Sequence, residues 1–153
     1  MTSWANRRII VGLEPQGRSA VVADAEDMAQ TEPLTGFVVQ EIWSQDRVPG
    51  AVADDGLRTG DIDIEPPGAG ALVRVLTVAP LASAADWTAN LHDDDNRHVL
   101  TLVSGDIDLV LEDGEVTLHA GDSVVMSGHV HDWRNTSGTP AVLVYTSFPL
   151  RRD

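Results

Sequence analysis

The fold of this chain is decided between residues 100 and 126, where the sequence reads LTLVSGDIDLVLEDGEVTLHAGDSVVM. Ile107 and Leu109 alternate there with acidic residues, which is the two-residue period of a strand with one buried face. Asp113-Gly114 is a strong hairpin signal, and the same alternation resumes after it. The stretch therefore predicts antiparallel strands joined by tight turns.

Similar short segments flank this stretch on both sides. Ala71 to Val78 precedes it and Ala141 to Phe148 follows it, and both are rich in valine and leucine. In the first third of the chain, glycines separate three more such segments, Arg8 to Val11, Ala20 to Ala23 and Phe37 to Trp43. Val48 to Asp55 fits either a short helix or a loop. Many short strands at a spacing of roughly 8–12 residues predict an all-β, antiparallel sandwich or barrel.

Length and composition predict a single domain that spans residues 1–153. No apolar run approaches the roughly 20 residues that a membrane-spanning helix needs. The stretch from Met1 to Arg8 lacks the apolar core of a signal peptide. The sequence contains no cysteine, which rules out disulfides and thiolate metal sites. Together these features favour a cytoplasmic protein.

The charge of the chain restricts the class of its partners. The net charge is −14, from 24 acidic and 10 basic residues, and every basic residue is arginine. Such a surface repels the phosphates of nucleic acids and the anionic surfaces of membranes. We therefore expect neither a nucleic-acid partner nor a membrane partner.

The five histidines all lie in the second half of the chain, at His92, His98, His119, His129 and His131. On a continuous strand that begins near Leu91, His92, Asp94 and His98 would share the inward face with Leu100, because side chains alternate. Metal coordination would remove the cost of burying these polar groups. The competing interpretation is that Asp93 to Asn96 forms a solvated turn, which would break this register.

His131 strengthens the metal interpretation because it begins a segment that carries Trp133. His129 has the same parity and is an alternative ligand, although its place at a turn favours exposure. His119 lies on a polar hairpin position, and we interpret it as a surface residue.

Two segments of this half resemble the paired motifs of the cupin superfamily. The first family motif, G-x5-H-x-H-x3,4-E-x6-G, corresponds here to His92-x-Asp94-x3-His98-x6-Gly105. The second, G-x5-P-x-G-x2-H-x3-N, corresponds to GDSVVMSGHVHDWRN at residues 121–135. The stretch from Arg7 to Trp43 is similar to the leader of a subgroup of small bacterial cupins.

The resemblance implies one divalent metal ion (zinc, iron, manganese or nickel) bound by His92, Asp94, His98 and His131. Asp94 stands where the family usually has its second histidine, and His98 stands where it usually has glutamate. The two residue types are exchanged, so the set still contains three imidazoles and one carboxylate. Met126 replaces the proline of the second motif.

The fold that the resemblance implies is a double-stranded β-helix, or jelly-roll barrel, over residues 70–148. Residues 1–69 would complete the barrel or form the edge of a homodimer. The implied function is a metal-dependent enzyme, such as a cyclase, dehydratase, decarboxylase or dioxygenase, acting on a small apolar organic molecule. His98 or Asp94 would then be the general base. The alternative is a non-catalytic cupin that binds or senses a small molecule and keeps a vestigial metal site.

Two further side chains are candidates for the substrate pocket. Arg74 lies in an otherwise apolar segment and is a candidate to hold a carboxylate or enolate, with a structural ion pair as the alternative. Trp133, like Trp43 and Trp87, is a candidate to line an apolar cavity, with an ordinary core position as the alternative.

Overall fold

The structure is a computed structural model that describes residues 7–51, 56, 58–64 and 69–151. The described residues form eleven strands and one short 3-10 helix, and none of their helices is long and apolar enough to cross a membrane. The strands are β1 (Arg8–Leu13), β2 (Ser19–Ala25), β3 (Gln30–Leu34), β4 (Phe37–Gln45), β5 (Ala71–Val78), β6 (Asn96–Ser104), β7 (Asp106–Leu111), β8 (Gly114–His119), β9 (Ser123–Ser127), β10 (His131–Arg134) and β11 (Ala141–Pro149); the 3-10 helix is Ala84–Asp86.

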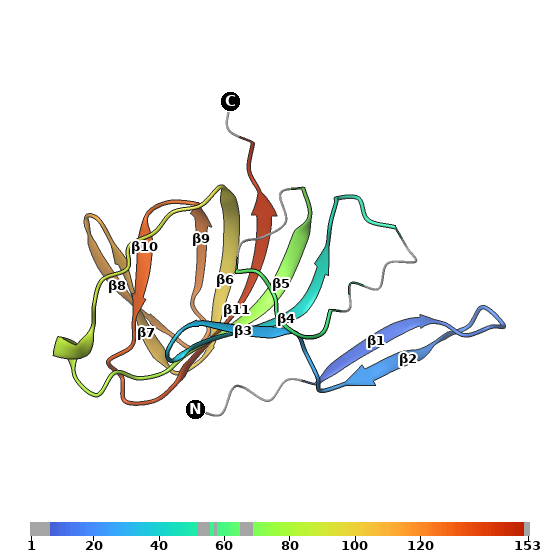
Figure 1. Ribbon diagram of the computed structural model, residues 1–153, viewed down its shortest axis with the longest axis horizontal. Coiled ribbons are helices and arrows are strands. Elements are labelled where there is room, and N and C mark those ends of the chain that lie inside the picture. Colours follow the sequence, from blue (N-terminus) through green and yellow to red (C-terminus); the bar gives the residue numbers. More distant parts are fainter. Residues whose placement is uncertain (1–6, 52–55, 57, 65–68, 152–153) are drawn as a thin grey trace.

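Most of these strands belong to two sheets that pack against each other (Figure 1). The larger sheet has six strands in the order β3-β4-β5-β11-β6-β9, and the smaller has three in the order β10-β7-β8. Every pair of neighbouring strands is antiparallel. The all-β, antiparallel fold class predicted from the sequence is therefore confirmed.

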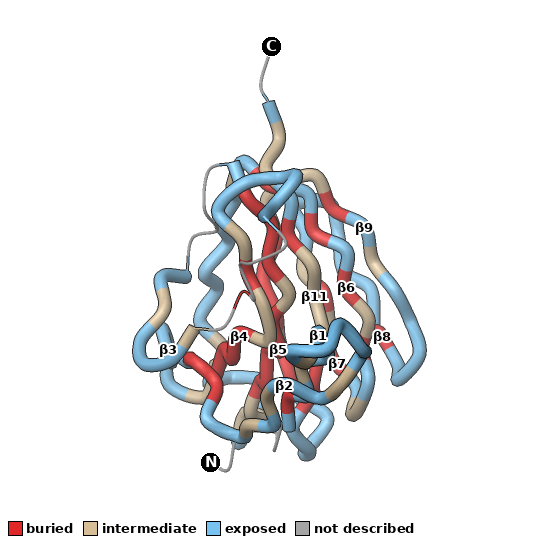
Figure 2. The backbone as a smooth tube through the Cα atoms, turned by 90° about the vertical axis from the view of Figure 1, so that its right-hand side faces the viewer, coloured by how far each residue is buried: buried red, intermediate tan, exposed pale blue. Residues whose placement is uncertain are grey.

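The core fills the space between the two sheets, because each strand places its apolar side chains on the inward face. In β6, Leu100 and Leu102 are buried while Val99 and Val103 are exposed, as alternation requires. The buried segments of β4, β5, β6 and β11 run side by side through the centre of the molecule in Figure 2. The core cluster comprises Val39, Leu76, Val78, Leu100, Leu102, Ile107, Leu109, Leu118, Met126, Trp133, Ala141 and Leu143.

The chain passes from the larger sheet to the smaller one through Gly105, between β6 and β7. Its φ is +77°, a conformation that side chains with a Cβ atom rarely adopt, and a Cβ atom there would collide with the carbonyl oxygen of Pro140. The turn at Ser104-Gly105 is thus a corner that only glycine fits. It lets one continuous run of sequence contribute strands to both walls of the core.

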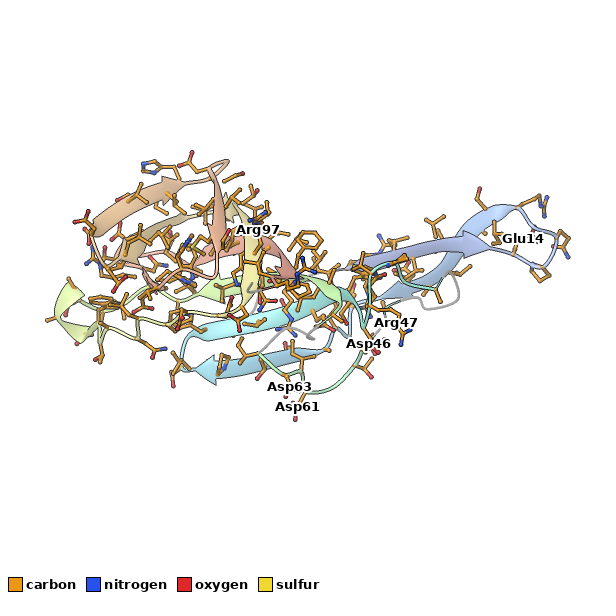
Figure 3. All side chains as sticks on the ribbon, turned by 90° about the horizontal axis from the view of Figure 1, so that it is seen from above. Glu14, Asp46, Arg47, Asp61, Asp63 and Arg97 are labelled. Atoms are coloured by element: carbon orange, nitrogen blue, oxygen red, sulfur yellow. The ribbon has the colours of Figure 1, made fainter. Side chains whose placement is uncertain are left out.

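The hairpin formed by β1 and β2 projects away from the two sheets, with Glu14 near its tip (Figures 1 and 3). In the part of the chain that the structure describes, these two strands pair only with each other. Their exposed side chains include Val11 and Leu13. At the base of the hairpin, the buried Arg8 guanidinium donates to the main-chain oxygens of Glu41 and Ile42. Arg8 thereby ties the hairpin to β4.

The structure confirms the strands predicted in the N-terminal third of the chain and adds one more. The predicted segments fall within β1, β2 and β4, whereas β3 was not predicted. β3 is an edge strand with a proline and mostly exposed side chains, so its sequence lacks the periodic burial that marks a strand. Of the stretch Val48 to Asp55, residues 48–51 are irregular and residues 52–55 lie outside the described residues.

Candidate functional site

A cavity of about 390 Å³ lies between the larger sheet and β10. Most of its wall is apolar, and its polar groups come mainly from β6, β10 and the loop that precedes β6. A space of this size accommodates a small organic molecule. Its lining residues are Pro33, Leu34, Phe37, Val39, Ile64, Leu76, Asn90, His92, Asp93, Asp94, His98, Leu100, Met126, His131, Asp132, Trp133 and Tyr145.

All four metal ligands predicted from the sequence, His92, Asp94, His98 and His131, line this cavity. The ring centroids of His92 and His131 lie 4.4 Å apart, and those of His98 and His131 lie 6.4 Å apart. The fold therefore brings together side chains that are up to 39 positions apart in the sequence.

The loop before β6 brings His92 to the cavity without being part of a strand that continues into β6. β6 begins only at Asn96, so the prediction of a strand from near Leu91 is wrong. The irregular residues Asp93 to Asp95 break the register, as the turn interpretation expected, but Asn96 is buried and belongs to β6. His92 instead pairs with the first residue of β10. The His92 amide donates to the His131 carbonyl at 3.1 Å, and the His131 amide donates to the His92 carbonyl at 3.0 Å. This main-chain pairing sets the two imidazoles side by side.

The Nδ1 atoms of His92 and His131 are held by main-chain carbonyls. His92 Nδ1 lies 2.8 Å from the oxygen of Asn90, and His131 Nδ1 lies 2.8 Å from the oxygen of His129. Because a carbonyl can only accept, each Nδ1 carries the hydrogen, and in the neutral ring Nε2 keeps its lone pair. Among the described residues, neither Nε2 atom has a hydrogen-bond partner. Both rings are therefore prepared to accept a bond at Nε2.

His98 is held at both nitrogens. Its Nε2 lies 2.6 Å from Oδ2 of Asp94, and its Nδ1 lies 2.6 Å from Oγ of Ser147. Ser147 is fully buried and does not line the cavity, so its hydroxyl orients the ring and is not an accessible nucleophile. A hydroxyl can donate or accept, which makes Ser147 compatible with either tautomer of His98.

Asp94 is fixed by its own loop and by a close approach of Gly128. The Asn96 amide donates to Asp94 Oδ1 at 2.8 Å, which leaves Oδ2 for His98. The Asp94 amide donates to the Gly128 carbonyl, and a Cβ atom on Gly128 would collide with the Asp94 carbonyl oxygen. Gly128 also has a φ of +66°. The glycine of the second motif is thus needed to seat the loop that carries Asp94.

Burial lowers the pKa of His131 below its usual value of 6.5, because the charged ring would lose its hydration. The neighbouring imidazoles of His92 and His98 act in the same direction, and the hydrogen bond to the His129 carbonyl opposes it. His131 is therefore neutral at pH 7, which is the form that can bind a metal ion or accept a proton.

The chemistry of these donors fits a divalent metal ion, since three imidazoles and a carboxylate suit zinc, iron, manganese and nickel. As they are placed, however, the described residues contain no group of three or more His, Asp or Glu side chains that would hold an ion. In this arrangement His98 Nε2 contacts Asp94 Oδ2, so two of the four donors are paired with each other. His92 and His131 are the two donors whose Nε2 lone pairs remain available to an ion.

Comparison with known proteins shows which family part of this chain resembles. A family model described as the cupin domain matches residues 75–147, which include the second half of β5, all of β6 to β10 and most of β11. Residues 75–147, just under half of the chain, are therefore similar to a cupin domain. The predicted jelly-roll fold class is confirmed, because solved structures of cupins share this fold. No protein of curated function matches the chain.

Several solved structures share the fold of this chain. KdgF from a Halomonas species is 11% identical, with a TM-score of 0.53 over 80% of this chain and 89% of that one. An RmlC-like cupin from Shewanella frigidimarina is 17% identical, with a TM-score of 0.51 over 84% and 90% of the two chains. A sugar phosphate isomerase of the superfamily from Silicibacter pomeroyi is 15% identical, with a TM-score of 0.50 over 79% and 69%. At these identities the likeness concerns the fold alone.

The two residues predicted for the substrate pocket occupy different places in the structure. Trp133 is 5% exposed and lines the cavity. Arg74 does not line it, and its guanidinium pairs with the Glu41 carboxylate, as in the structural alternative. Trp43 and Trp87 are half-buried and do not line the cavity.

Tyr145 and Asp132 are among the cavity residues that sequence reasoning missed. Asp132 accepts hydrogen bonds from the amides of Asn90 and Trp133, each at 2.7 Å, so its carboxylate fixes the cavity wall. Burial raises the pKa of Tyr145, and the Arg74 guanidinium opposes this shift. The inward parity of β11 was the available signal for Tyr145, since Leu143 and Ser147 on the same face are fully buried.

The remaining histidines lie outside the cavity lining. His129 is exposed, as its place at a turn suggested, and it contributes its carbonyl to His131. His119 is exposed as predicted, and its Nδ1 lies 2.8 Å from Oδ1 of Asp106.

We expect the pKa of His119 to lie above 6.5, chiefly because of the hydrogen bond from its ring to Asp106. The folded state then binds this proton more tightly than the unfolded state does. The small resulting stabilisation is present below the ordinary histidine pKa and is lost as pH rises through the raised value. An NMR titration of the His119 ring protons measures the pKa. Asp106→Asn should return it towards 6.5, and a wild-type value at or below 6.5 would contradict the interaction.

Proposed function

We propose that this protein is a metal-dependent enzyme acting on a small, largely apolar organic molecule. One observation carries the proposal: three imidazoles and one carboxylate converge on a cavity whose wall is otherwise mostly apolar. The apolar wall would hold the body of the molecule by excluding water, and the polar cluster would face its reactive group.

The metal ion would be held by His92, His131 and His98, with Asp94 as the carboxylate ligand. His92 and His131 offer their Nε2 lone pairs directly. His98 would offer Nε2 once its hydrogen moves to Nδ1, and the Ser147 hydroxyl can accept that hydrogen bond. When bound, a divalent ion supplies Lewis acidity towards a carbonyl oxygen or acidifies a water molecule.

The pairing of His98 with Asp94 supports a role in proton transfer. Whichever of the two is not bound tightly would hold a proton at His98 Nε2 or Asp94 Oδ2 and move it to or from the substrate. Ser147 and the Asn96 amide keep both groups oriented while the proton moves.

Elemental analysis of untagged protein tests the metal site. We expect about one equivalent of a divalent metal in the parent and almost none in the double variant His92→Ala/His131→Ala, because each lost imidazole removes a ligand. The double variant His119→Ala/His129→Ala is the matched control. It removes two histidines outside the cavity, keeps the His129 carbonyl and should retain the metal.

The identity of the metal would separate redox from non-redox chemistry. A parent protein that holds no metal after reconstitution with zinc, iron, manganese and nickel would overturn the metalloenzyme proposal. Equal metal content in both double variants would overturn the assignment of the ligands.

A second candidate function is metal-free binding of a small molecule. The observation that favours it is the 2.6 Å contact between His98 Nε2 and Asp94 Oδ2, which satisfies both groups without a metal. Well-folded protein without metal that binds apolar ligands in the cavity would support this candidate.

A further inference from the structure

Three polar residues lie in one row across the larger sheet, on β4, β5 and β11. Glu41 is paired in register with Arg74, and Arg74 is paired in register with Tyr145. Tyr145 is paired in turn with Leu100, whose side chain belongs to the core. Residues opposite each other in an antiparallel sheet point to the same face. The row therefore runs along the inward face and ends at the cavity, which Tyr145 lines.

The hydrogen bonds of Arg74 leave one donor for Tyr145. Nε and Nη2 both donate to Oε2 of Glu41, at 3.0 and 2.9 Å. Nη1 donates to the Ile64 carbonyl at 2.9 Å, and Nη2 also donates to the Asp63 carbonyl at 2.7 Å. Four of the five N–H groups of the guanidinium are thus engaged, and the fifth is on Nη1. The guanidinium also lies near enough to the Tyr145 phenol to lower the pKa of that phenol, against the effect of burial.

The chemistry of arginine sets the direction of the contact that we infer between Arg74 and Tyr145. A guanidinium has no acceptor, so its N–H would donate and the Tyr145 oxygen would accept. The hydroxyl hydrogen of Tyr145 is then left for another group. Among the described residues, no acceptor for it is found, and a half-buried hydroxyl without an acceptor is costly. The edge of the Tyr145 ring also faces His98, with the ring centroids 6.1 Å apart.

We propose that the Tyr145 hydroxyl, oriented by the Arg74–Glu41 pair, donates a hydrogen bond to a carbonyl oxygen of the ligand. The ligand class is an uncharged carbonyl compound with an apolar body. A carboxylate suits the site poorly, because Glu41 already neutralises Arg74 and the cavity is lined by Asp93, Asp94 and Asp132. This inference rests on the proposed binding of a small apolar molecule in the cavity.

Two probes of similar size test the inference: acetophenone, which has a carbonyl group, and ethylbenzene, which does not. In the wild-type protein we expect acetophenone to bind more tightly, and its infrared carbonyl band to shift to lower frequency. In Tyr145→Phe we expect acetophenone to bind about tenfold more weakly and the shift to disappear, because one hydrogen bond is lost. Ethylbenzene should bind both proteins equally, and thermal unfolding of the variant checks that the fold is retained.

The double variant Glu41→Leu/Arg74→Met tests the orienting role. It keeps Tyr145 but removes the donor behind it, so the preference for acetophenone should fall while ethylbenzene still binds. In His92→Ala/His131→Ala the carbonyl shift should persist, because Tyr145 is intact.

The outcomes separate this inference from the proposed function. Equal affinity and an equal carbonyl frequency in wild type and Tyr145→Phe would overturn the inference while leaving the cavity as a ligand site. A shift that survives in Tyr145→Phe but disappears in the histidine variant would assign the carbonyl to the histidines and also overturn it. Failure of both probes to bind the wild-type protein would overturn the cavity as a ligand site and the inference with it.

Discussion

Replacing Glu41 by leucine is expected to lower the free energy of unfolding by about 3–5 kcal/mol. The Glu41 and Arg74 side chains are only 5% and 3% exposed, and the substitution leaves a buried guanidinium without its counter-charge. Breaking one partner of a buried pair is costly because the remaining charge cannot be hydrated. Urea unfolding followed by tryptophan fluorescence measures the change.

Two control variants make this result specific to the buried pair. Asp24→Ala breaks the exposed pair of Asp24 with Arg7 and should leave the free energy of unfolding almost unchanged, because water and salt screen this pair. Glu41→Leu/Arg74→Met removes both charges and should recover part of the stability lost in the single variant. A Glu41→Leu protein as stable as Asp24→Ala would show that the pair is not buried in solution.

Replacing Trp133 by alanine is expected to cost about 3–5 kcal/mol of stability, because it removes a large side chain from the core. Trp133 is 5% exposed, belongs to the core cluster and forms part of the cavity wall. The same change should weaken the binding of apolar ligands, since the enlarged cavity contacts them less closely. Thermal and urea unfolding, with a ligand titration, measure the two effects.

Trp87→Ala is the matched control for Trp133→Ala. Trp87 is half-buried, and the Arg134 guanidinium lies over its ring, 5.5 Å from the ring centroid. A cation–π contact of this kind contributes about 0.5–1 kcal/mol at a surface. Equal losses in the two variants would contradict the central place of Trp133 in the core.

The parts of the fold that could be predicted are those in which one face of a strand is buried. Such a strand leaves a two-residue period in its own sequence, as around Ile107 and Leu109, whose side chains are 2% and 3% exposed. β3 has no such period because it lies at an edge with little burial. Whether the chain forms a homodimer stays a prediction, because pairing with a second copy leaves no mark on the period of a strand.

The site was predictable as a set of residues but not as a geometry. Parity placed His98 correctly on the face shared with Leu100 and Leu102. Parity could not decide how His92 reaches the cavity, because that depends on pairing with His131, 39 positions away. The partner of Arg74 is Glu41, 33 positions earlier, and no local pattern reveals it. Tyr145 became a candidate only once this pair was placed behind it.

We expect the hairpin of β1 and β2 to unfold locally at a lower free-energy cost than the barrel. An isolated two-stranded hairpin is only marginally stable in water, and Arg8 ties this one to β4 at its base. Its amide hydrogens therefore exchange with solvent through local opening, while the rest of the fold stays intact. Amides in β11, which is paired on both sides, exchange only when the barrel itself opens. A melting curve then reports on the barrel alone, and a protease that cuts the hairpin leaves the cavity whole.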